Sequence, residues 1–457
     1  MKGVFVVGAG PAGIFAARQI AQAGYEVFLF NRDIKPGGLA EYGIYPTKDK
    51  MKFGLRKQFA KVLEMPNVHY FGHVQVGKNY DVTIADLEAM RPAAMVFACG
   101  AQASGKLGLP GEDAKGVYAA KDFVYNYNRL PPYAEMDFST GKRVAIIGMG
   151  NVAIDIAHWL LEDSPYRQLE DVVVLARRGP MEAKFDEKEI QYVDRHIARD
   201  ALSAELERVK ERCARCNQDV SPEKLFEEHF RRLKNPDFAF VPPRLTFRFL
   251  TSPTAILKDE QGRIAQIEVA ENDLVLRDDG STKAVATKER TIIEADALVF
   301  AIGDKQDPNI GLPMGPYGYA VEPDTGAPGK PHFQVWNPET DKPLAGRFVV
   351  GWARRASTGL VGIARHDGEL GADEAIEFVK NAPESDTLNE QQILARLEKK
   401  GLRPVTKVDL ELLGRAEQRE AAARQVSAFK FADNDAMFKA IAEEQVEAIA
   451  EESVTAP

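Results

Sequence analysis

Two glycine-rich loops of the same design most constrain the fold of this 457-residue chain. Each follows a short β-branched run and precedes an apolar pattern with helical spacing. Glycine at such a turn lets backbone N–H groups approach a pyrophosphate at a helix N-terminus, where the helix dipole favours negative charge. Two such loops therefore predict two dinucleotide sites, typical of enzymes that hold a flavin against a nicotinamide cofactor. The loops are Gly8-Ala9-Gly10-Pro11-Ala12-Gly13, after Val4 to Val7, and Gly148-Met149-Gly150-Asn151-Val152-Ala153, after Val144 to Ile147.

Length, charge and cysteine content limit the class of protein. A chain of 457 residues exceeds one hydrophobic core, so two or three domains are expected. The net charge of −9 argues against a nucleic-acid-binding protein, and the lack of a long apolar run or leader argues against a membrane protein. Three cysteines are too few for a four-cysteine iron–sulfur site. We expect a cytoplasmic monomer or homodimer without a metal site.

Strand patterns indicate an α/β fold with two Rossmann-like dinucleotide-binding domains, the NADP domain being inserted in a discontinuous FAD domain. The buried run Ala94 to Ala98 ends in small residues, and Ala297 to Ile302 repeats that pattern. These two strands mark where the chain leaves and re-enters the first domain. The expected parts are 1–104 (FAD domain, first part), 105–296 (NADP domain), 297–384 (FAD domain, second part) and 385–457 (a helical extension packed on the FAD domain, frayed from Ser453).

The residues that end the second strand of each site indicate which nucleotide binds. After Glu26 to Phe30 the chain has Asn31 where dinucleotide folds usually carry an acid for the ribose, so that contact is open to question. After Val172 to Ala176 come Arg177 and Arg178. Paired guanidinium groups favour the 2′-phosphate of NADP, which a carboxylate would repel. The alternative is that both arginines are solvated surface charges.

Several segments together resemble the adrenodoxin reductase family, the FAD-containing NADPH:ferredoxin reductases of glutathione-reductase type. The similarity covers nearly the whole chain and implies FAD in the first domain, NADP in the inserted one, and a ferredoxin-type iron–sulfur partner. The segments are Val7 to Gly13, Gly148 to Asp155, Arg177 to Pro180 with Phe185 and Glu189, Pro110 to Asp113, Phe247 to Pro253, Val350-Gly351-Trp352, and Ser357 to Gly362.

The resemblance implies cofactor contacts at matching positions. The FAD contacts would be Gly8, Gly10, Pro11, Ala12, Gly13, Asn31, Leu39, Val76, Trp352, Gly359, Leu360 and Val361. The NADP contacts would be Met149, Gly150, Asn151, Val152, Arg177, Arg178 and Glu189, with Gly359 also facing the nicotinamide. Taken singly, Trp352 could be a core residue and Glu189 a solvated helix residue.

One position departs from the family. Its members carry a histidine in a Pro-Asp-His-Pro context, whereas this chain has Lys48 at the aligned position, within Tyr45 to Lys50. Lysine keeps a positive charge but does not titrate near neutral pH unless it is strongly desolvated. We therefore make no prediction that depends on a histidine here, and the catalytic residues are left unassigned. Hydride transfer depends on how the two rings are positioned, which needs no such group.

The predicted function is transfer of electrons from NADPH to FAD as hydride and onward, singly, to a ferredoxin-type iron–sulfur protein, with the direction of electron flow left open. One alternative is an electron-input subunit of a larger complex, similar to the small subunit of glutamate synthase. Another is a dithiol reductase that uses Cys213 and Cys216, although a surface cysteine pair without redox duty is the preferred interpretation.

Basic residues between 191 and 250 could steer an acidic ferredoxin toward the protein. Acidic residues interleave with them, so a solvated amphipathic helix is the default interpretation. The basic residues are Arg195, Arg199, Arg208, Lys210, Arg212, Arg215, Arg231, Arg232 and Lys234.

Overall fold

The computed structural model describes residues 2–138, 140–235, 237–316, 318–323, 332–355 and 361–455. The chain divides into two compact units, which we take one at a time. Among the described residues, no helix combines the length and apolar character that a membrane span requires. Unit 1 comprises Met1–Ser104, Tyr125–Glu135 and Gly303–Pro457, and unit 2 comprises Gly105–Val124 and Met136–Ile302.

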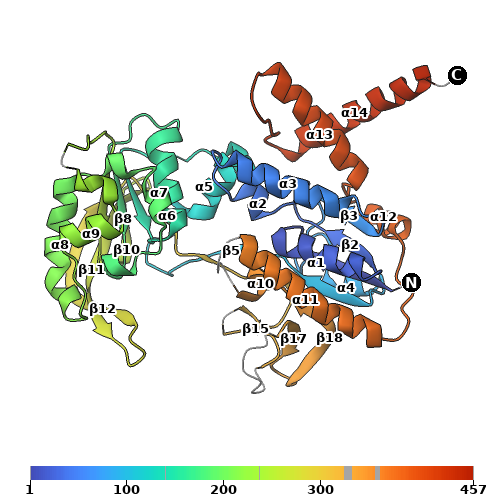
Figure 1. Ribbon diagram of the computed structural model, residues 1–457, viewed down its shortest axis with the longest axis horizontal. Coiled ribbons are helices and arrows are strands. Elements are labelled where there is room, and N and C mark those ends of the chain that lie inside the picture. Colours follow the sequence, from blue (N-terminus) through green and yellow to red (C-terminus); the bar gives the residue numbers. More distant parts are fainter. Residues whose placement is uncertain are drawn as a thin grey trace. The chain divides into compact units, whose positions relative to one another are not determined.

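Unit 1 is built on a sheet in the order β17-β18-β4-β1-β2-β3, parallel except for β17 (Figure 1). The central strands β1 and β4 are buried along their whole length, which explains their continuous apolar runs, because a parallel sheet is covered on both faces. The strands are β1 (Gly3–Val7), β2 (Glu26–Phe30), β3 (Val68–Phe71), β4 (Ala94–Phe97), β17 (Gln334–Asn337) and β18 (Lys342–Val349).

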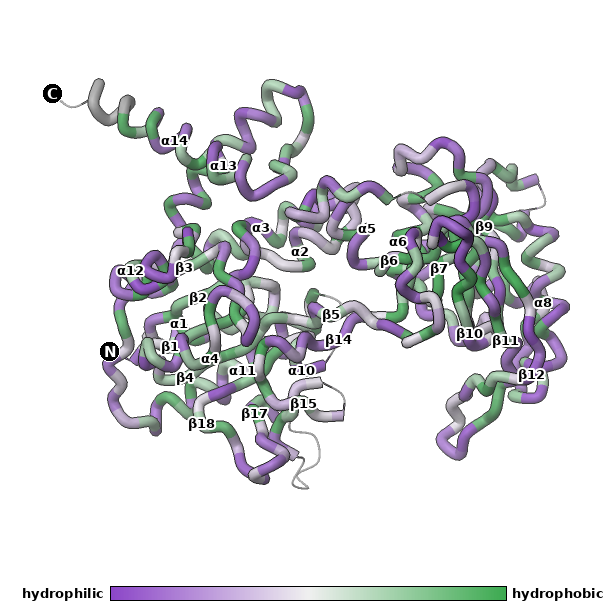
Figure 2. The backbone as a smooth tube through the Cα atoms, turned by 180° about the vertical axis from the view of Figure 1, so that it is seen from behind, coloured by the Kyte–Doolittle hydropathy of each residue, from purple (hydrophilic) through white to green (hydrophobic). Residues whose placement is uncertain are grey.

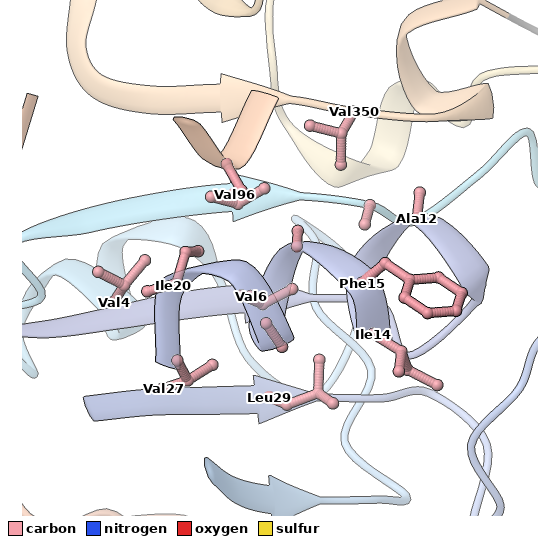
Figure 3. Close-up of a cluster of buried hydrophobic side chains, with 14 of the residues drawn as sticks. Val4, Val6, Ala12, Ile14, Phe15, Ile20, Val27, Leu29, Val96 and Val350 are labelled. Atoms are coloured by element: carbon pink, nitrogen blue, oxygen red, sulfur yellow. The ribbon is translucent and has the colours of Figure 1, made fainter. Parts of the chain in front are cut away.

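Alternate residues of these strands point to two separate cores. Val4 and Val6 face one core, which α1, α3 and α11 cover, and Figure 3 shows Phe15 and Ile20 of α1 packed there. Phe5 and Val7 face the core on the opposite side of the sheet, which includes residues of α4 and α12. The helices of unit 1 are α1 (Pro11–Gln22), α2 (Leu39–Tyr42), α3 (Asp49–Leu63), α4 (Ile84–Glu88), α10 (Trp352–Arg355), α11 (Val361–Asn381) and α12 (Glu390–Lys399).

The C-terminal helices α13 (Lys407–Ala423) and α14 (Asn434–Thr455) form a small core of their own with Ile34. Thr406 is the N-cap of α13 and forms a capping box with Asp409. The Thr406 hydroxyl accepts from the Asp409 N–H, and the Asp409 carboxylate accepts from the Thr406 N–H. The last helix continues to Thr455, past the start of the end that was expected to fray at Ser453.

Unit 2 combines a parallel sheet in the order β6-β13-β7-β8-β9 with an antiparallel sheet, β10-β11-β12. In Figure 2 the buried strand β7 consists mainly of hydrophobic residues, whereas helix α8 is largely hydrophilic. The strands are β6 (Val117–Ala119), β7 (Arg143–Ile147), β8 (Asp171–Leu175), β9 (Arg244–Arg248), β10 (Thr251–Lys258), β11 (Ile264–Leu276), β12 (Thr282–Glu294) and β13 (Ala297–Phe300). The helices include α6 (Asn151–His158), α7 (Glu187–Ile190), α8 (Arg199–Ala214) and α9 (Pro222–Glu228), and α5 (Ala120–Tyr127) is shared between the units.

Candidate dinucleotide sites

The first glycine loop connects β1 to α1 and uses its glycines in two different ways. Gly8 has a φ of +107°, and a Cβ there would lie 2.5 Å from the Ala98 carbonyl oxygen. A Cβ on Gly13 would overlap the Gly8 carbonyl, so both positions need glycine for chain packing. At Gly10, the N-cap of α1, nothing lies within 4 Å of the added Cβ. This open space before a helix N-terminus fits a pyrophosphate.

The side chain of Asn31, predicted as a cofactor contact, is occupied by the protein itself. Its Oδ1 accepts from the Ala9 N–H at 3.0 Å. Its Nδ2 donates to the carbonyls of Asp33 and Lys35 at 2.8 and 3.0 Å, and lies 3.1 Å from the Tyr70 hydroxyl. The buried amide therefore fixes the glycine loop to the segment after β2. Sequence spacing identified the position but not these long-range partners.

Two further segments close over the first glycine loop. The Gly37 N–H donates to the Ala9 carbonyl at 2.7 Å, and a Cβ on Gly38 would lie 3.1 Å from Gly10 Cα. Leu39, a predicted FAD contact, begins α2 directly after this turn. On the other side, a Cβ on Gly351 would lie 2.6 Å from the Ala12 methyl group. Backbone thus packs against the loop from both sides.

A buried carboxylate holds the segment near Gly351. The Gly351 N–H donates to Asp367 of α11 at 2.6 Å, and the Arg354 guanidinium pairs with the same carboxylate. Arg354 also lies over the Phe333 ring at 4.4 Å. This arrangement positions Trp352, whose carbonyl accepts from Gln306 Nε2 at 3.0 Å.

The remaining predicted FAD contacts lie in the two cores of unit 1 or outside the described residues. Val76 is buried in the core on the α4 side of the sheet. Val361 begins α11 and is partly buried against the core on the α1 side. Gly359 and Leu360 lie outside the described residues. Lys48, at the family's histidine position, is the N-cap of α3, and its N–H donates to the Tyr45 carbonyl at 3.0 Å.

A buried charge cluster fixes α2 to α3 and to the C-terminal extension. Glu41 of α2 accepts two bonds of 2.6 Å from Arg56 of α3 and one of 2.6 Å from Lys430. Burial alone would raise the pKa of Glu41, but the Arg56 hydrogen bonds and the nearby Lys430 and Lys35 charges outweigh burial and lower it to about 2. Lys35 itself pairs with Glu417 of α13 at 2.5 Å. The C-terminal extension thereby stabilises the Gly37–Gly38 turn, which packs on the first glycine loop.

The second glycine loop, between β7 and α6, repeats the first at its centre. Gly148 has a φ of +130°, and a Cβ there would overlap the Ala301 carbonyl. Gly150 is the N-cap of α6, again with nothing within 4 Å of an added Cβ. The next two positions are more open, and Val152 is 47% exposed. This loop also leaves room for a pyrophosphate at a helix N-terminus.

One neighbouring segment supports the second loop. The Lys184 N–H donates to the Met149 carbonyl at 2.9 Å. The Asn151 amide bonds to Asp186 in both directions, donating to its carboxylate at 2.8 Å and accepting from its N–H at 2.7 Å. Glu189 lies three residues further, in the short helix α7. The structure thus brings Met149 to Val152 together with the start of α7.

Arg177 and Arg178 follow β8 as predicted, and hydrogen bonds hold their backbone; Arg177 is exposed and Arg178 half-buried. The Arg177 carbonyl accepts from Asn272 Nδ2 at 2.8 Å, and the Arg178 carbonyl accepts from the Leu250 N–H at 3.1 Å. Neither guanidinium forms an ion pair within the part of the chain that the structure describes. Two such groups at a strand end can bind a phosphate bidentately.

The expected surface location of the two neighbouring cysteines was wrong. Cys213 is fully buried at the end of α8, and Cys216 is only 6% exposed. Burial raises the pKa of the Cys213 thiol to about 12, with the Glu182 charge acting in the same direction. A thiol with such a pKa is poorly nucleophilic, which argues against a dithiol reductase. The helical pattern around residue 210 could have indicated that Cys213 faces inward.

The basic residues between 191 and 250 are largely neutralised inside unit 2. Within the described part of the chain at least eight of the nine form ion pairs, for example Arg208 with Glu205 and Glu271. This pairing agrees with the default interpretation of a solvated, internally balanced surface rather than a steering patch.

Comparisons with known proteins agree on one family. A family described as pyridine nucleotide-disulphide oxidoreductase matches residues 2–228. NADPH-ferredoxin reductase FprA of Mycobacterium leprae is 31% identical over 415 residues, which cover 84% of this chain and 85% of that protein. The mitochondrial NADPH:adrenodoxin oxidoreductase of Salvelinus fontinalis is 29% identical over 457 residues, covering 92% and 87%.

A solved structure extends the likeness to the fold. Mycobacterium tuberculosis FprA in complex with NADPH matches with a TM-score of 0.79 and 26% identity, covering 97% of this chain and 99% of that one. The predicted α/β fold of pyridine-nucleotide oxidoreductase type is therefore confirmed.

Proposed function

Because the chain belongs to the NADPH-ferredoxin and adrenodoxin reductase family, as its motifs predicted, we propose that it is a ferredoxin–NADP(+) reductase. It takes electrons from NADPH and passes them through FAD to a ferredoxin-type iron–sulfur protein. FAD, when bound, accepts electrons in pairs and can release them singly, as a one-electron iron–sulfur acceptor requires.

The observation that carries this proposal is the pair of open N-caps, Gly10 and Gly150. At each, a helix N-terminus faces space that no Cβ fills, while Gly8 and Gly148 let the loop approach a neighbouring carbonyl, that of Ala98 or Ala301. Both loops thus suit a dinucleotide pyrophosphate. We assign FAD to unit 1 and NADPH to unit 2.

The assignment of FAD to unit 1 rests on how its loop is enclosed. The Gly37 turn, the Asn31 amide and the Gly351 segment all bond to or pack against this loop. Such an enclosed site suits a cofactor that stays bound through many turnovers. The proposed FAD residues are those predicted from the sequence, except that Asn31 positions the loop through its hydrogen bond to Ala9 rather than contacting the cofactor.

The assignment of NADPH to unit 2 rests on Arg177 and Arg178. Their guanidinium groups are free to bind a 2′-phosphate, because the described residues offer them no carboxylate. The loop beside them is exposed at Val152, which suits a substrate that must enter and leave. The proposed NADP residues are Met149, Gly150, Asn151, Val152, Arg177, Arg178 and Glu189.

We place the enzyme in the cytoplasm. Cys99, Cys213 and Cys216 are all free thiols, which suits a reducing compartment.

The function is tested by comparing acceptors. Purified protein, reconstituted with FAD, should oxidise NADPH with an artificial dye and also reduce an added [2Fe–2S] ferredoxin. NADH should support both reactions far less well. Reduction of the dye without reduction of any ferredoxin tested would reject the proposed acceptor class, and equal use of NADH and NADPH would reject the assigned role of the arginines.

A further inference from the structure

Helix α3 of unit 1 carries an outward face that combines basic and apolar side chains. Lys50, Phe53, Lys57 and Lys61 recur at intervals of three and four residues, so they lie along one side of the helix. Phe53 is 57% exposed, and the Lys57 ammonium lies 4.5 Å from its ring centre. Met51, equally exposed, adjoins this side. We call the four residues the α3 outer face.

The charge of this segment is opposite to that of the whole protein. Residues 48–61 contain six lysines or arginines and one acid, Asp49, within a chain of net charge −9. Some of this charge is used internally, since Arg56 pairs with Glu41 and Lys52 donates to Asn128 at 2.5 Å. Lys50, Lys57 and Lys61 form no ion pair with any residue in the described ranges. Their charge therefore remains available to a partner.

This arrangement differs from the basic region of unit 2. There, an arginine such as Arg212 is already paired with a buried carboxylate, Glu271. A paired cation exerts little field at long range because its partner cancels it, whereas three unpaired lysines on one helix face add their fields. The number of basic residues in the sequence does not distinguish these two cases.

The opposite side of α3 places this face close to the first glycine loop. Phe59 packs edge-on against Phe15 of α1 at 5.9 Å, and Phe59 and Val62 belong to the core that α1 covers. Arg56 also binds Glu41 of α2, the helix that follows the Gly38 turn. The α3 outer face is thus one helix thickness, about 10 Å, from the layer that carries the proposed flavin loop.

We propose that the α3 outer face is the docking surface for the acidic iron–sulfur carrier. The inference rests on the proposed function and adds the place where the partner binds. Unpaired lysines attract a carrier rich in Asp and Glu and raise its encounter rate, while Phe53 and Met51 supply apolar contact once the rim charges meet. The paired surface of unit 2 offers no comparable attraction.

The test reverses the charge of this face. The triple variant Lys50→Glu, Lys57→Glu, Lys61→Glu is compared with the control Lys288→Glu, Lys399→Glu, Arg415→Glu, which makes the same net change at scattered exposed positions. We expect the KM for an acidic [2Fe–2S] ferredoxin, and its Kd by calorimetric titration, to rise about tenfold or more at low salt in the first variant only. The KM for NADPH and the rate with dye should stay unchanged in both.

Several outcomes separate this inference from the function on which it rests. A wild-type protein that reduces dye but no ferredoxin contradicts the proposed function. A wild-type protein that reduces ferredoxin, with both triple variants equally affected, overturns the docking surface alone. A third outcome is that wild-type protein sediments with phosphatidylserine vesicles, the α3 variant does not, and both bind ferredoxin equally. This result would identify a membrane surface as the occupant and would also overturn the proposal. A Phe53→Ser variant with weaker binding but unchanged salt dependence would support the apolar contribution.

Discussion

The two glycine loops have the same chemistry but very different enclosure. Ala12 in the first loop is 6% exposed, whereas Val152 at the matching position of the second is 47% exposed. Gly351 and the Gly37 turn close over the first loop, and the short segment from Lys184 to Asp186 bonds to the second. Under the proposed assignment, one glycine motif serves both for a resident cofactor and for an exchanging one. The difference lies in what other parts of the chain contribute.

The two asparagines show the same contrast. Asn31 is buried, and its four hydrogen bonds join the first loop to β3 and to the segment after β2. Asn151 makes a two-way bond to Asp186 at a solvent-exposed position. A buried amide that loses its partners leaves unsatisfied groups behind, at about 1 to 3 kcal/mol each, whereas an exposed one is replaced by water.

The largest effect is expected from adding one methyl group to a glycine of each loop. Gly13→Ala forces a Cβ into the Gly8 carbonyl, so α1 must shift, and we expect little folded flavoprotein. Gly150→Ala has room for its methyl group in the protein but fills the space in front of α6. It should therefore keep its FAD and its thermal stability while the KM for NADPH rises. Flavin content, thermal melting and NADPH kinetics distinguish the two, and equal flavin loss in both variants would contradict the assignment.

The next effect concerns the choice of nicotinamide cofactor. Removing both guanidinium groups in Arg177→Ala, Arg178→Ala should lower the kcat/KM for NADPH by about 100-fold or more, because each charge-assisted bond contributes about 1.5 to 3 kcal/mol. The kcat/KM for NADH should change little. Steady-state kinetics with both cofactors measures the ratio, with Arg277→Ala as an exposed control. If the preference for NADPH survives, another group must select it.

A smaller effect is expected from the paired asparagine variants. Asn31→Ala should weaken FAD binding by about 10-fold or more, because at least one buried partner loses its hydrogen bond at about 1 to 3 kcal/mol. Asn151→Ala should leave FAD binding unchanged and weaken NADPH binding only a few-fold. Equilibrium dialysis of FAD and the KM for NADPH provide the two measurements. The contrast between buried and exposed amides fails if Asn151→Ala costs more than Asn31→Ala.

The smallest effect concerns pH and the Glu41 cluster. The pKa of Glu41 is lowered to about 2, so the stability it contributes is present above its ordinary pKa of 4.5 and is lost as the pH falls from 4.5 toward 2. Lys430→Met removes one of the cations that lower this pKa, so flavin release on acidification should begin at a higher pH. Lys439→Met, at an exposed position of α14, is the control. Flavin fluorescence measured against pH reports the release of FAD. Identical curves for both variants would show that the C-terminal extension does not stabilise the flavin site.

Local signals were sufficient to predict both glycine loops and their strands. The run Glu26 to Phe30 forms β2 with the expected bounds, because a buried parallel strand needs a continuous run of apolar residues. The glycine loops could be recognised because their pattern depends on no distant residue. Arg177 and Arg178 were found in the same way, by their place after β8, and their role in selecting NADP stays a prediction.

The remaining features depend on contacts between residues far apart in the sequence. Lys430 meets Glu41 across 389 residues, and nothing near either residue indicates the other. The partners of Asn31 and the pairing that neutralises Arg208 are similar cases. Composition could not show which basic residues are paired, so the sequence directed attention to unit 2. Lys50, Lys57 and Lys61 of α3, which form no ion pair with any described residue, were therefore missed.

The most direct test of the contrast between the loops measures which nucleotide stays with the protein. Protein incubated with excess FAD and NADP⁺ is passed through a desalting column, and both nucleotides in the protein fraction are then quantified. We expect FAD to remain in an amount equal to the protein and NADP⁺ to be removed. Loss of both nucleotides, or retention of both, would contradict the account that enclosure of the first loop makes its cofactor resident while the second loop exchanges.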